Sequence, residues 1–213
     1  MSDVVVIDYG VGNLLSVRRG LEHCGAQVTV TADLEAILGA ARVVLPGVGA
    51  FANGMAELRK PGLDQVVRQL AASGKPLLGI CLGMQMLLDE STEFGITKGL
   101  GLIPGKVIAV PSEGAGGEPH KIPHIGWNAL LPSPGCENWN CGLLQDIDSG
   151  DAVYFVHSFM ASPLDPAHHV ADCLYDGIRV AAVIARDNVM GCQFHPEKSG
   201  EVGLNILRRF LRL

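Results

Sequence analysis

A cysteine between two glycines is the residue of this chain whose setting most clearly suggests chemistry. The stretch Gly79-Ile80-Cys81-Leu82-Gly83 separates an apolar run from a helical one. It has the form of a nucleophile elbow, a sharp strand-to-helix turn that exposes the reactive side chain. The glycines allow strand and helix to approach closely, and the N-terminus of the helix favours a thiolate. We therefore predict that Cys81 is a nucleophile.

The other cysteines carry no such pattern. A free cysteine is commonly a buried, small apolar residue, and we interpret five in this way: Cys24, Cys136, Cys141, Cys173 and Cys192. Cys192 and His195 have the spacing of a zinc-ligand pair, but no second pair stands at ligand spacing. We predict neither a metal site nor a cofactor.

A nucleophilic cysteine needs a base, and the base needs a group that orients it. His195 follows an apolar run and precedes Pro196, and Glu197 is close enough in sequence to hold one tautomer of the ring. We predict these roles for His195 and Glu197. A plain surface turn with a solvated glutamate is the alternative. The competing histidines are His120, His124, His157, His168 and His169.

An acyl-transfer reaction also needs N–H donors for its oxyanion. The N–H of Leu82 directly follows the nucleophile. A second donor is available in the stretch "LPGVGAF" (45–51), where a Pro-Gly-x-Gly loop can bring the N–H of Val48 or Gly49 towards the sulfur. A phosphate-binding loop is disfavoured because no Lys-Ser/Thr pair follows. An ordinary strand-to-helix turn is the remaining alternative.

The first half of the chain alternates strand-like and helix-like segments, which predicts a parallel sheet with helices on both faces. The predicted strands are 4–8, 26–31, 42–47 and 76–81, and the predicted helices are 13–25, 33–39, 63–73 and 82–88. In such a sheet, ligands bind beyond the carboxyl ends of the strands. Cys81 stands at that end of the fourth strand.

From residue 105 the pattern changes to strands joined by turns, which predicts antiparallel or mixed strands added to the sheet or beside it. These strands are 105–110, 126–131, 152–159, 169–175, 178–185 and 189–195, followed by a helix over 203–213. The polar, Gly-rich loop 111–123 is expected to be mobile. The predicted fold class is α/β, with a mostly parallel, open, twisted sheet in one domain over 1–213.

Composition narrows the function classes. A formal net charge of −6 and the absence of a Lys/Arg cluster argue against nucleic-acid binding. No apolar run is long enough to span a membrane. No basic segment precedes the first apolar run, so we expect no signal peptide, and the irregular cysteine spacing fits reduced thiols in the cytoplasm.

The motifs together resemble a known family. "GICLGMQ" with a distant "FHPE" is similar to the class I, triad-type glutamine amidotransferases. "DYGVGN", "LPGVGAF", "PHIGWN", "YFVHSF" and "FHPEKSG" narrow the resemblance to the glutaminase subunits of imidazole glycerol phosphate synthases. These stretches run from Asp8 to Gly200, nearly the whole chain.

The resemblance implies that Cys81 attacks the side-chain carboxamide of L-glutamine. His195, oriented by Glu197, would take the thiol proton and pass one to the leaving ammonia. The resemblance also implies a set of glutamine-binding positions: Gly49, Gln85, Ser158 and Phe159. Gln85 lies one helical turn after Cys81. A solvated helix position for Gln85, and a strand end for Ser158 and Phe159, are the structural alternatives.

The resemblance implies a partner as well, a (β/α)8-barrel cyclase in a heterodimer. The cyclase would use the ammonia to form imidazole glycerol phosphate and aminoimidazole carboxamide ribotide in histidine biosynthesis. Asn13, Trp127 and Lys198 match positions at or near that interface. Tryptophan is a frequent interface anchor, although a core position for Trp127 is equally open.

The resemblance also implies that the isolated subunit is nearly inactive. We hypothesise that the Gly47–Val48 peptide is the switch, because flanking glycines make a peptide flip easy. Three rival functions stay open. The first is a glutaminase for pyridoxal phosphate, GMP or anthranilate synthesis. The second is a free-standing hydrolase of gamma-glutamyl peptides, and the third is a catalytically silent interaction subunit.

Overall fold

A mixed sheet forms the centre of the protein. The computed structural model describes residues 2–134, 136, 139 and 142–213, so the interpretation of Cys141 lies outside the described residues. Among these residues the main sheet has eight strands, in the order β2-β1-β3-β4-β14-β13-β12-β9. Its parallel part consists of β2 (Ala26–Thr31), β1 (Ser2–Ile7), β3 (Val43–Gly47), β4 (Leu77–Cys81) and β14 (Val189–Cys192). Its antiparallel part consists of β13 (Ile178–Arg186), β12 (His169–Tyr175) and β9 (Leu131–Pro132).

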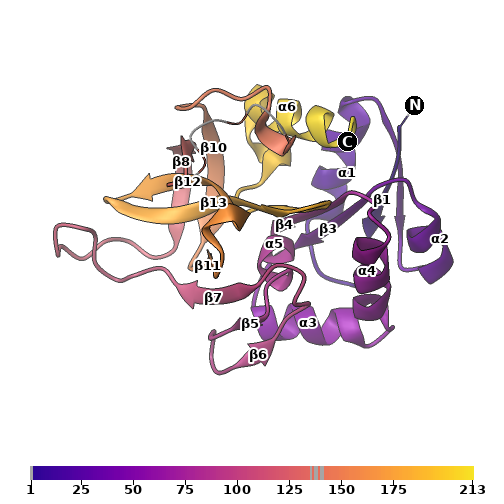
Figure 1. Ribbon diagram of the computed structural model, residues 1–213, viewed down its shortest axis with the longest axis horizontal. Helices are drawn as coiled ribbons and strands as arrows, with labels where there is room; N and C mark the ends of the chain where they lie inside the picture. Colours follow the sequence, from indigo (N-terminus) through magenta and orange to yellow (C-terminus); the bar gives the residue numbers. More distant parts are fainter. Residues whose placement is uncertain (1, 135, 137–138, 140–141) are drawn as a thin grey trace.

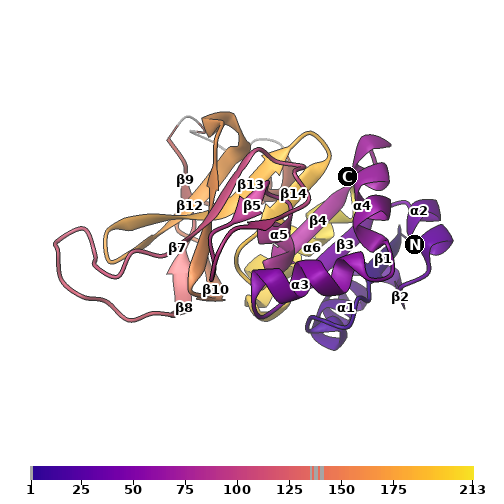
Figure 2. The same cartoon turned by 90° about the horizontal axis from the view of Figure 1, so that it is seen from below.

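Helices cover both faces of the parallel part (Figures 1 and 2). One face carries α1 (Leu14–His23) and α6 (Gly200–Phe210), and the other carries α2 (Leu34–Gly39), α3 (Phe51–Arg59), α4 (Leu63–Ala72) and α5 (Leu82–Met86). Successive side chains of a strand point to opposite faces. In β1, Val4 and Val6 accordingly join the core beneath α1 and α6, and Val5 and Ile7 join the other core.

Two smaller sheets lie beside the main one. The first pairs β8 (His124–Ala129) with β10 (Ala152–His157) in antiparallel fashion. The second has the order β11-β7-β5-β6 and consists of β11 (Phe159–Pro163), β7 (Gly105–Ala109), β5 (Glu90–Ser91) and β6 (Thr97–Lys98). Short 3-10 helices occur at η1 (Gly142–Leu144), η2 (Pro166–His168) and η3 (Pro196–Lys198). The predicted fold class is confirmed.

Several predicted boundaries were wrong. Helix α3 was not predicted because Ala50, at its N-cap, has no side chain that can accept a hydrogen bond. The carboxylate of Glu93 caps it instead, accepting the Phe51 N–H at 2.7 Å. The predicted strand 152–159 breaks at Ser158 into β10 and β11, and 126–131 is divided between β8 and β9. Strands β5 and β6 were missed because they are very short.

The loop 111–123 extends away from the sheets (Figure 1). It folds back on itself through a bridge between Glu113 and Pro119, and His120 contacts Asp176 at 3.1 Å. Its mobility stays a prediction. Within the described residues, no helix combines the length and the apolar character that crossing a membrane requires.

Candidate active site

The turn at Cys81 has the geometry of a nucleophile elbow. Cys81 ends β4 and caps α5, with φ 55° and ψ −112°. A non-glycine residue rarely adopts such a conformation, and it indicates a position that the surrounding fold enforces. A Cβ on Gly83 would lie 1.8 Å from the Leu45 carbonyl oxygen, and one on Gly79 would lie 2.7 Å from the backbone of Gly83. The two glycines are therefore required by the close approach of strand and helix.

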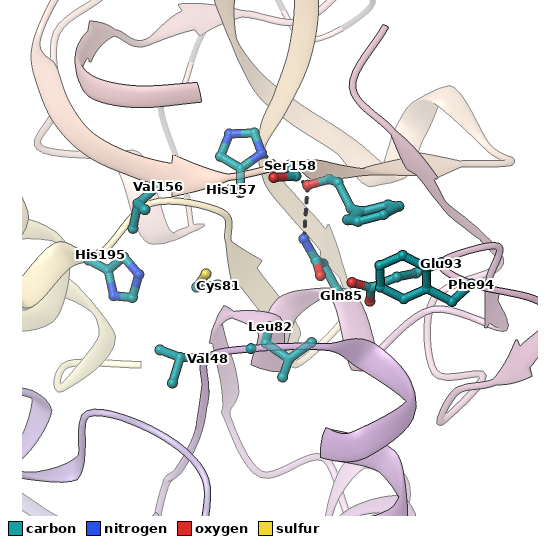
Figure 3. A pocket seen from close by; sticks show the side chains of 12 residues that line it. Val48, Cys81, Leu82, Gln85, Glu93, Phe94, Val156, His157, Ser158 and His195 are labelled. Atoms are coloured by element: carbon teal, nitrogen blue, oxygen red, sulfur yellow. Dashed lines mark hydrogen bonds between the residues drawn. The ribbon is translucent and has the colours of Figure 1, made fainter. Parts of the chain in front are cut away.

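The arrangement of the sheet brings the His-Pro-Glu segment to this turn. Strand β14 lies beside β4 in parallel, with Cys192 opposite Ile80, so the chain that leaves β14 emerges next to Cys81. The His195 Nδ1 lies 2.9 Å from Oε1 of Glu197, and both side chains are buried. Because a carboxylate can only accept, Nδ1 carries the proton and Nε2 is the ring nitrogen left for Cys81. Figure 3 shows the imidazole beside the sulfur.

The electrostatics of His195 suit a proton carrier. Burial by itself lowers the pKa of His195, but its interactions with Cys81 and Glu197 outweigh burial and raise the pKa to about 9. The imidazole therefore holds its second proton at neutral pH next to a nucleophilic sulfur. The second oxygen of Glu197, Oε2, is buried and has no hydrogen-bond partner within the described residues.

His157 is the competing histidine that lies nearest to this chemistry, because it lines the same cavity. Both of its nitrogens are engaged: Nδ1 lies 2.9 Å from the Phe159 carbonyl oxygen, and Nε2 lies 3.0 Å from Nδ1 of His124. Burial and the neighbouring His124 lower the pKa of His157 to about 3. Burial likewise lowers the pKa of His124 to about 4. His157 is thus neutral with both nitrogens engaged, and His195 stays the candidate base.

The cavity in front of Cys81 has a volume of about 410 Å³, which is within the usual range for small-molecule sites. Its walls come from the loop after β3, the elbow, the β5–β6 turn and the break between β10 and β11 (Figure 3). The lining residues are Val48, Gly49, Cys81, Leu82, Gln85, Glu93, Phe94, Val156, His157, Ser158, Phe159 and His195. All predicted substrate and oxyanion residues are among them.

The expected oxyanion donors surround the mouth of the elbow. Leu82 is the first residue of α5, and Gly49 has a φ of +91° in the loop after β3. Within the described residues, the N–H groups of Val48 and Gly49 donate to no acceptor. The preceding residues are held more firmly, since the Tyr9 hydroxyl donates to the Pro46 carbonyl at 2.8 Å.

Other cavity residues were not found from the sequence. Glu93 and Phe94 lie in the turn between β5 and β6, and Phe94 is 93% exposed with its ring edge-to-face against Phe159. An aromatic residue in a polar turn was the available signal.

Gln193 was also missed. It is fully buried, and its Nε2 lies 3.8 Å from the Cys81 sulfur. A polar residue inside the apolar run "VMGCQF" was its signal.

The predicted interface residues lie outside the cavity. Trp127, on β8, is 58% exposed, so the core alternative is wrong, and the buried tryptophan is Trp139. A Cβ on Gly200 would lie 3.8 Å from the Trp127 ring, so this ring sits beside the start of α6, which follows the exposed Lys198 of η3 by two residues. Asn13 caps α1 by accepting from the Ser16 N–H at 3.4 Å.

Comparison with known proteins identifies the family of this chain. The sequence model of the family described as glutamine amidotransferase class-I matches residues 5–213. The chain belongs to this family. It is 54% identical, over the full length of both chains, to imidazole glycerol phosphate synthase subunit HisH 1 of Legionella pneumophila strain Lens. It is 50% identical to the HisH subunit of Methylococcus capsulatus, with 100% of this chain and 97% of the relative covered.

Solved structures of other amidotransferases share the fold. A crystal structure of a glutamine amidotransferase superposes with a TM-score of 0.72 at 18% identity, covering 98% of this chain and 97% of the other. The PurLQS structure from Thermotoga maritima gives a TM-score of 0.72 at 21% identity, with 100% and 99% covered. At these identities the likeness shows the fold alone.

Proposed function

We propose that this chain is the glutaminase subunit of an imidazole glycerol phosphate synthase. The observation that carries the proposal is the elbow cysteine facing a buried His195–Glu197 pair in one cavity. The names of the relatives at 50% identity and above supply the pathway, histidine biosynthesis. We also infer that residues 1–213 act as one domain, because the cavity takes its walls from both halves of the chain.

The geometry supports a thioester mechanism. The Cys81 sulfur attacks the side-chain carbonyl carbon of L-glutamine, and the carbonyl electrons move onto oxygen to form a tetrahedral intermediate. When this collapses, the C–N bond breaks, and the protonated His195 gives its proton to the leaving nitrogen, which departs as ammonia. A water molecule then attacks the thioester while His195 takes its proton. Glutamate leaves and the sulfur is restored.

The remaining cavity residues bind and polarise the substrate in this proposal. The N–H of Leu82 and that of Val48 or Gly49 stabilise the oxyanion. The α-carboxylate and α-ammonium groups of glutamine contact three residues deeper in the cavity: Gln85, Ser158 and Phe159.

The Gly47–Val48 peptide is the proposed switch. Val48→Pro removes its N–H, and unchanged glutaminase activity of that variant in the complex would reject the switch.

The partner is a (β/α)8-barrel cyclase that receives the ammonia directly. Trp127 is the proposed anchor, because a large exposed aromatic side chain beside the start of α6 fits an interface better than a solvated surface. Asn13 belongs to the same proposed contact, in addition to capping α1. We propose a cytoplasmic location, because a nucleophilic thiol must stay reduced.

The test is release of glutamate from L-glutamine by the purified chain, alone and with the barrel cyclase plus its nucleotide ligand. Activity that appears only with partner and ligand supports the proposal. Comparable activity of the chain alone would indicate a free-standing hydrolase. Complex formation without glutamate release would indicate a silent subunit. Cys81→Ala should abolish activity, whereas the matched variant Cys24→Ala should retain it.

A further inference from the structure

Gln193 is a buried polar residue that the mechanism above does not use. Its side chain has no exposed surface, and it lies between β14 and His195. A buried amide is costly unless its groups are hydrogen-bonded, so the partners it finds show what its position requires. The Oε1 of Gln193 lies 3.0 Å from Nε2 of Gln85, and its Nε2 lies 3.8 Å from Sγ of Cys81.

One carbonyl group determines which amide atom of Gln85 and of Gln193 is the donor and which is the acceptor. The Phe159 carbonyl can only accept, so the Gln85 atom 2.9 Å from it must be the amide nitrogen Nε2. The same nitrogen has a second hydrogen, which it donates to Gln193. The Gln193 atom that receives it must therefore be oxygen, and this leaves the Gln193 amide nitrogen facing the sulfur.

The position of Phe159 is itself fixed. Its carbonyl oxygen accepts a second hydrogen bond from Nδ1 of His157, whose Nε2 accepts in turn from His124. Both lone pairs of the carbonyl are thus occupied. A side-chain relay therefore runs from the His157 pair through Gln85 and Gln193 to Cys81, and it cannot be reversed without leaving a buried donor or acceptor unpaired.

We propose that Gln193 is a positioning residue for the nucleophile, which donates a hydrogen bond to the Cys81 sulfur in its thiolate form and keeps the side chain in one orientation. The Gln85 amide determines the direction of this donation. A hydrogen bond to the charged form of a group favours that form. The inference rests on the proposed role of Cys81, but its test measures the sulfur directly.

The titratable groups around the sulfur are His195 with Glu197 behind it, Tyr9 after β1, and Cys192 in β14. His195 interacts with the sulfur as a cation. The Tyr9 hydroxyl donates to the Pro46 carbonyl and the Cys192 thiol to the Gly79 carbonyl. Within the described residues, Gln193 is therefore the neutral donor to the sulfur in this set. Removing it weakens the thiolate without changing any charge.

The experiment is alkylation of Cys81 by iodoacetamide as a function of pH, with the labelled Cys81 peptide quantified by mass spectrometry. The wild-type chain is compared with Gln193→Met, which removes the amide and keeps the chain length. We expect the pH of half-maximal alkylation to rise by about one unit. Gln193→Glu, which places an oxygen against the sulfur, should shift it further. The matched control is Met190→Ala, a packing change in β14 that removes no titratable group.

For Met190→Ala we expect a lowered thermal midpoint and an unchanged alkylation profile. The same result for Gln193→Met would overturn the proposal. If Gln193→Met does not fold, Gln85→Met tests the same relay: it frees the Gln193 amide to turn, and a smaller shift in the same direction is expected, whereas no shift would reject the relay. In the complex with the cyclase, Gln193→Met should lower kcat for glutamine with little change in KM. If the wild-type chain shows no glutaminase activity in the complex, the proposed function is rejected. The alkylation result would still be valid.

Discussion

His157 should make the free energy of unfolding fall in acid, and the structure determines the size of this effect. Burial and His124 lower its pKa from 6.5 in the unfolded chain to about 3. The unfolded chain therefore takes up a proton as the pH falls through 6.5, and the folded chain does not until about pH 3. The stability that His157 contributes is present above pH 6.5 and is lost as the pH falls towards 3.

The magnitude at about pH 5 follows from the gap of about 1.5 pH units below the unfolded pKa. At about 1.4 kcal/mol per unit, this is about 2 kcal/mol. That is a large fraction of a typical folding free energy of about 5–15 kcal/mol. His124, whose pKa is lowered to about 4 by burial, acts in the same direction.

The measurement is urea unfolding of the wild type and His157→Asn at about pH 7 and about pH 5. Asparagine can still donate to the Phe159 carbonyl but cannot titrate. His195, whose pKa is raised to about 9, is common to both proteins and cancels in the comparison. We expect the wild type to lose about 2 kcal/mol more than the variant between the two pH values. The slopes of the urea transitions should agree.

One result would refute this reasoning: a loss of stability between about pH 7 and about pH 5 that agrees within about 0.5 kcal/mol for wild type and variant. The imidazole would then be charged in the folded protein, or its nitrogens would be reached by water. Val156→Ala is the packing control, because it lies in the same cavity wall and carries no titratable group. It should lower stability equally at both pH values.

Three further predictions concern the catalytic pair, the elbow and the interface. Glu197→Gln keeps the shape of a fully buried side chain but removes the charge beside His195. The kcat/KM for glutamine in the complex should therefore fall about 100-fold or more. An unchanged value would show that Glu197 has no part in the mechanism. Gly83→Ala places a Cβ 1.8 Å from a backbone oxygen and should cost more than about 3 kcal/mol by thermal unfolding, whereas Gly39→Ala, with open space around it, should be neutral or slightly stabilising. Trp127→Ala should weaken cyclase binding about tenfold or more by titration calorimetry with little change in thermal midpoint, and Leu164→Ala, at a residue that is 79% exposed, should leave binding unchanged.

The local parts of the site were accessible from the sequence because neighbouring residues determine them. The elbow needs only a strand, a Gly-x-Cys-x-Gly turn and a helix, all within a short stretch that ends at Gly83. His195 and Glu197 are close in sequence, and Pro196 between them restricts the backbone, so their contact is also a local property. The alternation of elements in the first half likewise predicted a parallel sheet.

Tertiary structure alone decided which distant groups meet. Gln193 contacts Cys81 across 112 positions because β14 inserts beside β4, and no periodicity in the sequence specifies that neighbour. Helix α3 begins where it does because Glu93 caps it from 42 positions away. The pairing of β8 with β10 places His124 opposite His157, and burial there lowers the pKa of both side chains. The physical reason is common to all three: the identity of a buried polar residue shows that it needs a partner, but packing decides which partner it has.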